Sequence, residues 1–135
     1  MKIEEVFARR RFIMLDGAMG TQLQLRGLTT EQKPELAAFI MPDVLTAVHR
    51  DYARAGADIL LANTFGANPR KLKGTGYTVQ QVIEASIACA RTAAQETGAL
   101  VALDIGPIGE LLEPMGLLSF EEAYEIFARQ VRQGA

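Results

Sequence analysis

Residues 59–66, ILLANTFG, decide the fold class of this 135-residue chain. An apolar run of three residues leads through a small residue into polar side chains and a glycine. Two further apolar runs occur, FIML at 12–15 and LVAL at 100–103. None of the runs alternates apolar with polar residues, which is typical of strands buried on both faces of a parallel sheet. The sequence therefore predicts parallel strands at about 12–16, 58–62 and 100–104.

Helices are expected between these strands, because parallel neighbours need crossover connections. Apolar residues recur at helical spacing over 43–55, 79–97 and 120–133. Thr78 with Gln81, and Ser119 with Glu122, form capping-box patterns at the starts of the second and third helices. A glycine is expected to end each helix: Gly56, Gly98 and Gly134.

This alternation of strands and helices predicts an α/β protein, either an eight-stranded barrel or an open doubly wound sheet. The segment Gly17-Ala18-Met19-Gly20 is G-x-x-G, which lacks the spacing of a dinucleotide-binding loop. No Walker A loop and no nucleophile elbow occur. Each of the first two helices closes with Gly-Ala before a strand, and the chain ends on a third Gly-Ala at 134–135. We therefore expect a chain truncated before a fourth strand.

Composition excludes several classes of function. The net charge is −2 at pH 7 with no basic stripe, which argues against nucleic acid as a partner. No apolar stretch approaches the roughly 20 residues that span a bilayer. A single cysteine fits a reducing compartment, so we expect a cytoplasmic protein. The basic run Arg9-Arg10-Arg11 is interpreted as the solvated end of an N-terminal helix.

Candidate ligand-binding residues stand at the predicted strand ends, where α/β proteins place their sites. Each strand delivers a small polar side chain followed by glycine, and glycine allows a backbone to approach a ligand closely. Asp and Asn are also common turn formers, which is the alternative explanation. The pattern repeats at three strand ends, so we favour a small-molecule site. The candidates are Asp16, Gly17, Asn63, Thr64, Phe65, Asp104 and Gly106.

A complete metal site is not expected, because a catalytic zinc generally takes three protein ligands. The chain has one cysteine and one histidine. Cys89 falls on the predicted helix 79–97 and is interpreted as a small core residue. His49 falls on the helix 43–55 and is interpreted as a surface or half-buried structural residue.

Four motifs in order resemble the homocysteine S-methyltransferase family. They are LDGAMGTQLQ from residue 15, PD…VHRDY…AGAD from 42, NTFGAN from 63 and DIGPIGELLEP from 104. The last motif points to the branch of cobalamin-dependent methionine synthases and their N-terminal homocysteine-binding domain. Residues 61–62 depart from the family, because many members have an acidic residue and Thr where this chain has Leu61-Ala62.

The resemblance implies that residues 1–135 are the N-terminal part, about three βα units, of a TIM (β/α)8 barrel that binds homocysteine. It implies zinc held by cysteines beyond residue 135, and cobalamin and the methyl donor held by other domains or proteins. Asp16 and its loop would then hold the amino-acid end of homocysteine, while Thr64 and Phe65 would line the pocket floor. Methylcobalamin is the expected methyl donor, and these residues alone are expected to be inactive.

Two alternatives stay open at this point. A betaine- or S-methylmethionine-dependent homocysteine methyltransferase shares the DG and NTF elements. A non-catalytic α/β module could use the same strand-end loops to hold a small ligand without zinc.

Overall fold

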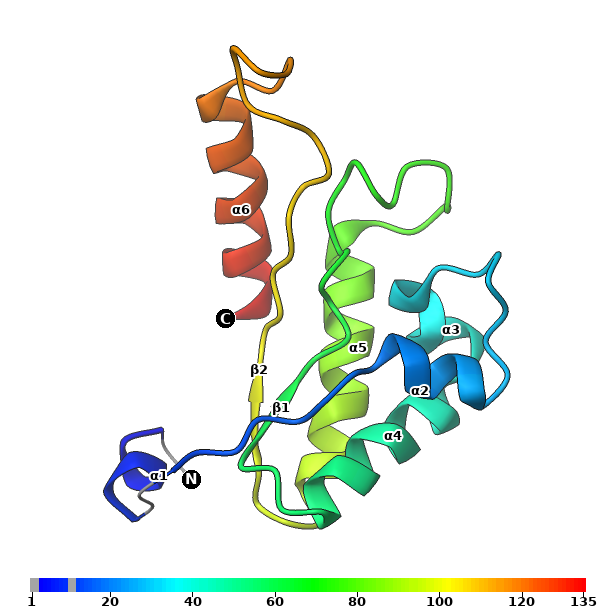
Figure 1. Ribbon diagram of the computed structural model, residues 1–135, viewed down its shortest axis with the longest axis vertical. Helices are drawn as coiled ribbons and strands as arrows, with labels where there is room; N and C mark the ends of the chain where they lie inside the picture. The colour runs from blue at the N-terminus through cyan, green and yellow to red at the C-terminus, as the bar shows by residue number, and fades with distance from the viewer. Residues whose placement is uncertain (1–2, 10–11) are drawn as a thin grey trace.

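The computed structural model describes residues 3–9 and 12–135, and Figure 1 shows its elements. Several short helices precede the first strand, and three long helices alternate with the strands. In chain order the elements are α1 (Ile3–Arg9), α2 (Gly20–Leu25), the 3-10 helix η1 (Pro34–Leu36), α3 (Ala37–Ile40), α4 (Pro42–Arg54), β1 (Ile59–Leu61), α5 (Val79–Ala94), β2 (Leu100–Ala102) and α6 (Phe120–Gly134).

The sheet is parallel, and its strands are neighbours in sequence order. β1 pairs with β2 from Ile59 opposite Leu100 to Leu61 opposite Ala102. The first apolar run adds a parallel bridge between Leu15 and Ile59 on the other side of β1. The prediction of parallel strands adjacent in sequence order is therefore confirmed.

The first predicted strand is shorter than expected, since only Leu15 of residues 12–16 forms a bridge. Met14 explains part of this difference. Its N–H donates to the Asp58 carboxylate at 3.0 Å instead of to a neighbouring backbone carbonyl. Its own carbonyl accepts from the backbone N–H groups of Asp58 and Ile59. The parallel direction is kept, although the regular ladder of a strand is not.

Helices α4 and α5 pack against each other and against the strands, as Figure 1 shows. Leu60 is fully buried in a cluster with Ala53 of α4 and with Ala93 and Ala94 of α5. The small alanine side chains let the two helices approach the sheet closely, so the bulk of Leu60 fills the space between them. This packing anchors β1 against α4 and α5.

The helix predictions are confirmed for all three long helices, with differences at their ends. Thr78 and Gln81 form the reciprocal capping box, with distances of 3.1 Å and 2.9 Å. The second predicted box is only half formed. Ser119 accepts from the backbone N–H of Glu122 at 3.2 Å, whereas the Glu122 carboxylate pairs with Arg70 instead of reaching back.

Gly134 does not end its helix, which corrects the prediction made for it. It lies within α6, and a Cβ built on it would lie 2.6 Å from the Leu103 side chain. Glycine is therefore needed here for close packing of α6 on the residues after β2. Gly56 and Gly98 do follow their helices with positive φ, as expected.

One face of α6 is apolar and exposed. Phe120, Tyr124, Phe127 and Val131 recur at helical spacing, and all four are exposed. The same four residues give the segment 120–133 its helical spacing of apolar residues, a pattern that is typical of a buried helix face. The face is therefore built for burial and has no cover among the described residues.

The interpretation of Arg9-Arg10-Arg11 is only partly testable, because Arg10 and Arg11 lie outside the described residues. Arg9 is the last residue of α1 and is exposed. Within residues 3–9 and 12–135, none of the helices combines the length and the apolar composition of a membrane span.

Candidate functional site

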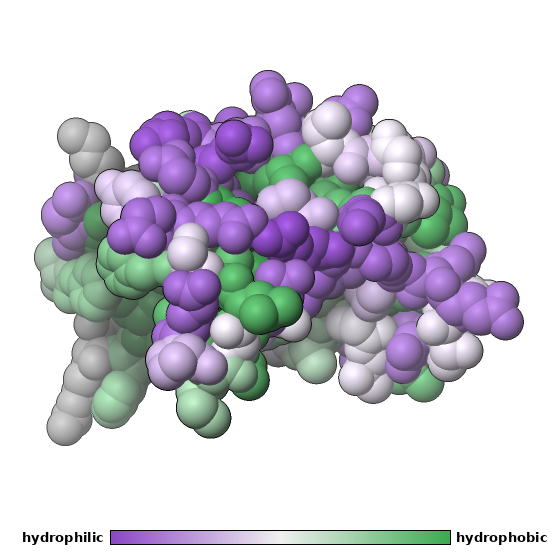
Figure 2. Space-filling model, turned by 90° about the horizontal axis from the view of Figure 1, so that it is seen from above, coloured by the Kyte–Doolittle hydropathy of each residue, from purple (hydrophilic) through white to green (hydrophobic). Residues whose placement is uncertain are grey.

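The three strand ends meet around a cavity of about 330 Å³, which is at the small end of ligand pockets. Figure 2 views the molecule from this end and shows apolar surface between hydrophilic side chains. Four of the seven predicted site residues line the cavity: Gly17, Asn63, Phe65 and Asp104. The remaining lining residues are Ala18, Met19, Gly20, Pro34, Glu35, Leu61 and Ala62.

Thr64 does not line the cavity but joins two of its walls. Its side chain is buried, and its Oγ1 donates to the Asp104 carbonyl at 2.8 Å. The same Oγ1 accepts from the Asp104 backbone N–H at 3.0 Å. The hydroxyl thus continues the contact between the β1 and β2 segments beyond the last backbone pair.

Phe65 is held from two sides. Gly106 donates its N–H to the Phe65 carbonyl at 3.1 Å, and a Cβ on Gly106 would lie 2.5 Å from that oxygen. Lys71 places its Nζ 5.3 Å from the centre of the Phe65 ring, within the range of a cation–π contact. Gly106 therefore permits the position of Phe65 instead of lining the cavity itself.

Asn63 holds η1 against the cavity, and the sequence did not predict that η1 would form one of the cavity walls. Its buried Nδ2 donates to the Pro34 carbonyl at 2.6 Å and fixes η1 over the strand end. The next residue, Glu35, packs its carboxylate on Gly66, where any Cβ would collide with it. Glu35 is an acidic lining residue that sequence reasoning missed. Two sequence features could have indicated this contact: Gly66, which follows the NTF motif, and the pair Pro34-Glu35.

Asp16 lies behind the cavity wall. Its side chain is 1% exposed, and its Oδ2 accepts from the Leu61 N–H at 3.0 Å. Its neighbours Gly17 and Leu61 line the cavity, whereas Asp16 does not. Burial is the main reason that the pKa of Asp16 rises to about 6, and the nearby charge of Asp104 adds to it. Burial also raises the pKa of Asp104.

His49 is fully buried, so the interpretation as a surface or half-buried residue is wrong. The period of α4 turns this residue inwards towards the first strand segment. Its Nδ1 lies 3.9 Å from Asp16 Oδ2. Burial lowers the pKa of His49 to about 4, so the ring is neutral at pH 7 and the contact is not an ion pair.

Tyr52 holds the loop that follows the first strand segment. Its hydroxyl donates to the Ala18 carbonyl at 2.8 Å. A Cβ on Gly17 would lie 3.0 Å from the Tyr52 ring, so glycine allows this close approach. Helix α4 therefore supplies both Tyr52 and His49 to the region beside the cavity.

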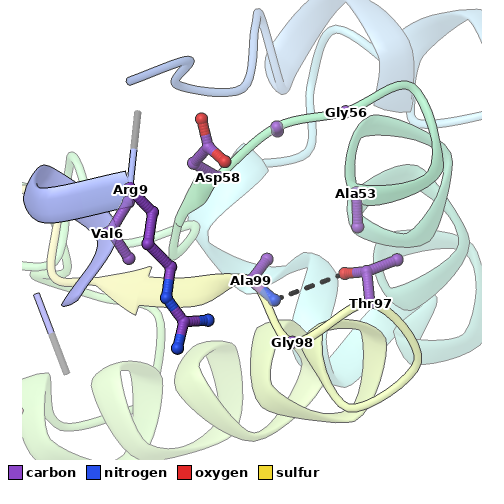
Figure 3. A pocket seen from close by; sticks show the side chains of 9 residues that line it. Val6, Arg9, Ala53, Gly56, Asp58, Thr97, Gly98 and Ala99 are labelled. Atoms are coloured by element: carbon purple, nitrogen blue, oxygen red, sulfur yellow. Dashed lines mark hydrogen bonds between the residues drawn. The ribbon is translucent and has the colours of Figure 1, made fainter. Parts of the chain in front are cut away.

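A second cavity of about 310 Å³ lies at the opposite, amino ends of the strands, and Figure 3 shows it. Its walls include Val6 and Arg9 of α1 together with Asp58 and Thr97. In Figure 3 the Thr97 hydroxyl faces the Ala99 backbone N–H, from which it accepts a hydrogen bond at 3.4 Å. Since α/β proteins place their sites at the carboxyl ends of strands, the candidate site is the other cavity.

The described residues do not fit a zinc site. Among them, no three His, Cys, Asp or Glu side chains gather as ligands. Cys89 is half-buried on α5 beside the α4 start, with its Sγ 4.0 Å from the Pro42 carbonyl, which agrees with a small packing residue. His49 lies on a different helix, α4, where its ring approaches the Asp16 carboxylate to 3.9 Å.

Comparison with known proteins identifies the class. A family model described as homocysteine S-methyltransferase matches residues 13–135. The methionine synthase of Mycobacterium tuberculosis is 38% identical over 97 residues, 66% of this chain and 8% of that protein. Betaine–homocysteine S-methyltransferase 1 of Danio rerio is 33% identical over 122 residues, 86% of this chain and 30% of that protein.

A solved structure agrees in fold. The chain superimposes on the homocysteine methyltransferase MmuM from Escherichia coli, metallated form, with a TM-score of 0.81 and 24% identity. The match covers 97% of this chain and 52% of that structure. The chain thus spans about half the length of this structure and less of the other relatives. The chain belongs to the homocysteine S-methyltransferase family.

Proposed function

We propose that this chain supplies the amino-acid-binding wall of an enzyme that transfers a methyl group to the sulfur of homocysteine. The observation that carries the proposal is the cavity at the strand ends. Gly17, Asn63, Phe65 and Asp104 come from three separate segments, and each segment belongs to a motif that resembles this family. A random set of turn formers would not converge on one cavity.

The charge of the cavity suits one end of an amino acid. Glu35 and Asp104 both line it, and Asp16 lies directly behind its wall. An ammonium group gains charge-assisted hydrogen bonds from carboxylates in a partly desolvated site. We infer that the amino group of homocysteine lies at this acidic side and that Phe65 contacts its apolar carbons.

We further propose that the three βα units belong to a (β/α)8 barrel, which typically needs about 250 residues. The exposed apolar face of α6 and the open edge of β2 support this view, because both are built for burial. Zinc and cobalamin, which the resemblance implies, are not assigned to any residue of this chain. The described residues offer no ligand set for zinc.

Methylcobalamin is the methyl donor that we favour. Identities to methionine synthases of two Mycobacterium species are 38% and 46%, although the second covers only 65 residues. Identity to the betaine-dependent relative from Danio rerio is 33%. The motif DIGPIGE at 104–110 also resembles the cobalamin-dependent branch.

The donor is tested by offering homocysteine to the complete gene product with methylcobalamin, betaine or S-methylmethionine in turn. Methionine, measured by mass spectrometry, should form with methylcobalamin. Formation with betaine or S-methylmethionine instead would assign the corresponding alternative. Tight homocysteine binding with no methionine from any donor would favour the non-catalytic binding module.

The site is tested by calorimetry of homocysteine binding to Asp104→Asn. Loss of one charge-assisted hydrogen bond should weaken binding by about ten- to a hundredfold. Asp51→Asn is the matched control, because Asp51 is exposed on α4 and pairs with Arg26 away from the cavity. Equal affinities of the two variants would contradict the placement of the substrate.

A further inference from the structure

A group of buried polar atoms without partners lies beneath the candidate site. Asp16 Oδ1 and both ring nitrogens of His49 are buried and make no hydrogen bond within the protein. Buried polar atoms are nearly always paired, so an unpaired set in one place calls for an explanation. These atoms belong to two side chains that approach to 3.9 Å.

Packing alone does not explain a histidine at this position. The residues before it on α4, Leu45 and Val48, are fully buried in an apolar cluster with Leu23. An aliphatic side chain at position 49 would fill similar space without leaving two nitrogens unpaired. A histidine here therefore carries an energetic penalty that a purely structural role does not require.

The protonation states suit a donor–acceptor pair. Burial lowers the pKa of His49 to about 4 and raises the pKa of Asp16 to about 6. At pH 7 the imidazole is therefore neutral, and the carboxylate is mostly ionised. Neutral imidazole carries one N–H donor, and an ionised carboxylate only accepts. Asp104 is the other acidic group whose charge acts on Asp16.

We propose that His49 is a positioning residue: when homocysteine binds, it donates its Nδ1–H to Asp16 Oδ2, and this contact brings Asp16 Oδ1 from behind the cavity wall to the amino group of the ligand. The inference rests on the proposed function, because it requires homocysteine in the strand-end cavity. Hydrogen bonds in ligand-free sites are often long and tighten when the ligand binds. The 3.9 Å separation would shorten in this way, and the ligand would pair the last free oxygen.

The test is a double-mutant cycle on homocysteine binding, measured by calorimetry on the complete gene product. The proteins are wild type, His49→Leu, Asp16→Asn and the double variant. His49→Leu should weaken binding roughly three- to tenfold, the value of one hydrogen bond. The same substitution should have no effect beyond roughly twofold in the Asp16→Asn background. An undiminished effect in that background would overturn the inference.

A conservative variant separates positioning from packing. His49→Asn can place its Nδ2 near the position of the imidazole Nδ1, whereas His49→Gln reaches the position of Nε2. Asn should therefore bind homocysteine more tightly than Gln, and equal affinities would overturn the inference. This comparison also serves if His49→Leu does not fold. Thermal melts followed by circular dichroism report the folded state of each variant.

The two hypotheses fail in different ways. If Asp16→Asn weakens binding and His49→Leu does not, the role of His49 is wrong and the proposed function stands. If neither variant changes the affinity for homocysteine while Asp104→Asn does, the roles of both Asp16 and His49 are wrong. If no variant of the cavity changes binding, the proposed site itself fails.

Discussion

Replacing Asp16 by Asn should make the protein more stable at pH 7, although it should weaken homocysteine binding. The Asp16 carboxylate is buried, and its Oδ2 accepts one hydrogen bond from the Leu61 N–H. An Asn oxygen can accept the same hydrogen bond without bringing a charge into the interior. The substitution therefore removes a burial penalty while it keeps the local contact.

The magnitude follows from the pKa of Asp16, which burial raises from 3.8 to about 6. One pKa unit corresponds to ~1.4 kcal/mol, so ionised Asp16 destabilises the folded state by about 3 kcal/mol at pH 7. The folded state holds the proton more tightly than the unfolded state. The stabilisation from protonation is therefore complete below pH 3.8 and is lost as the pH rises through about 6.

Asn does not titrate, so the stability difference between Asp16→Asn and wild type should depend on pH. It should be about 3 kcal/mol at pH 7 and fall below about 1 kcal/mol at pH 4. The titration of His49 works in the opposite direction, since its depressed pKa costs stability as the pH falls towards about 4. That contribution is present in both proteins and largely cancels in the difference.

Urea denaturation at pH 4, 5, 6 and 7, followed by circular dichroism, measures the free energy of unfolding of both proteins. Asp51→Asn is the control, because the Asp51 side chain is 60% exposed and surface charges contribute little. Its stability should differ from wild type by less than about 0.5 kcal/mol at each pH. A destabilised Asp16→Asn at pH 7, or a difference that does not change with pH, would refute the reasoning.

Three further predictions concern the loops, the exposed face and the metal. Gly106→Ala should displace Phe65, because the new Cβ would lie 2.5 Å from the Phe65 carbonyl oxygen. Calorimetry should therefore show weaker homocysteine binding for Gly106→Ala than for the control Pro107→Ala. The 135-residue chain on its own should self-associate through the apolar face of α6. Sedimentation velocity should show less association for the double variant Tyr124→Lys/Val131→Lys than for the control Arg132→Lys. The same chain should keep no stoichiometric zinc after dialysis, so one zinc per chain by elemental analysis, lost in Cys89→Ala, would show that the ligand assignment is wrong.

Much of the fold could be predicted because its signals are local. Unbroken apolar runs and helical spacing are sufficient for β1, β2 and the long helices. The short elements α2, η1 and α3 could not be predicted, because they have few residues and no side-chain caps. They are held in place by tertiary contacts, such as the bond from Asn63 to the Pro34 carbonyl. Helical periodicity does not report such contacts.

The candidate site was predictable in place but not in detail. Parallel strands bring their carboxyl ends together, so Gly17, Asn63, Phe65 and Asp104 were expected to converge, and they line one cavity. The depth of a side chain behind that cavity is set by packing between distant segments. For this reason sequence reasoning misjudged the burial of His49 and overlooked Glu35.

The order of strand pairing has a consequence for folding during synthesis. Leu15 pairs with Ile59, and Ile59 pairs with Leu100, so each strand joins one that the ribosome has already released. Each described strand after the first segment therefore finds its neighbour already synthesised, and neither β1 nor β2 has to wait for a later strand. The sheet can therefore grow in one direction with the nascent chain, and its newest edge, at β2, can pair with another nascent chain until it is covered.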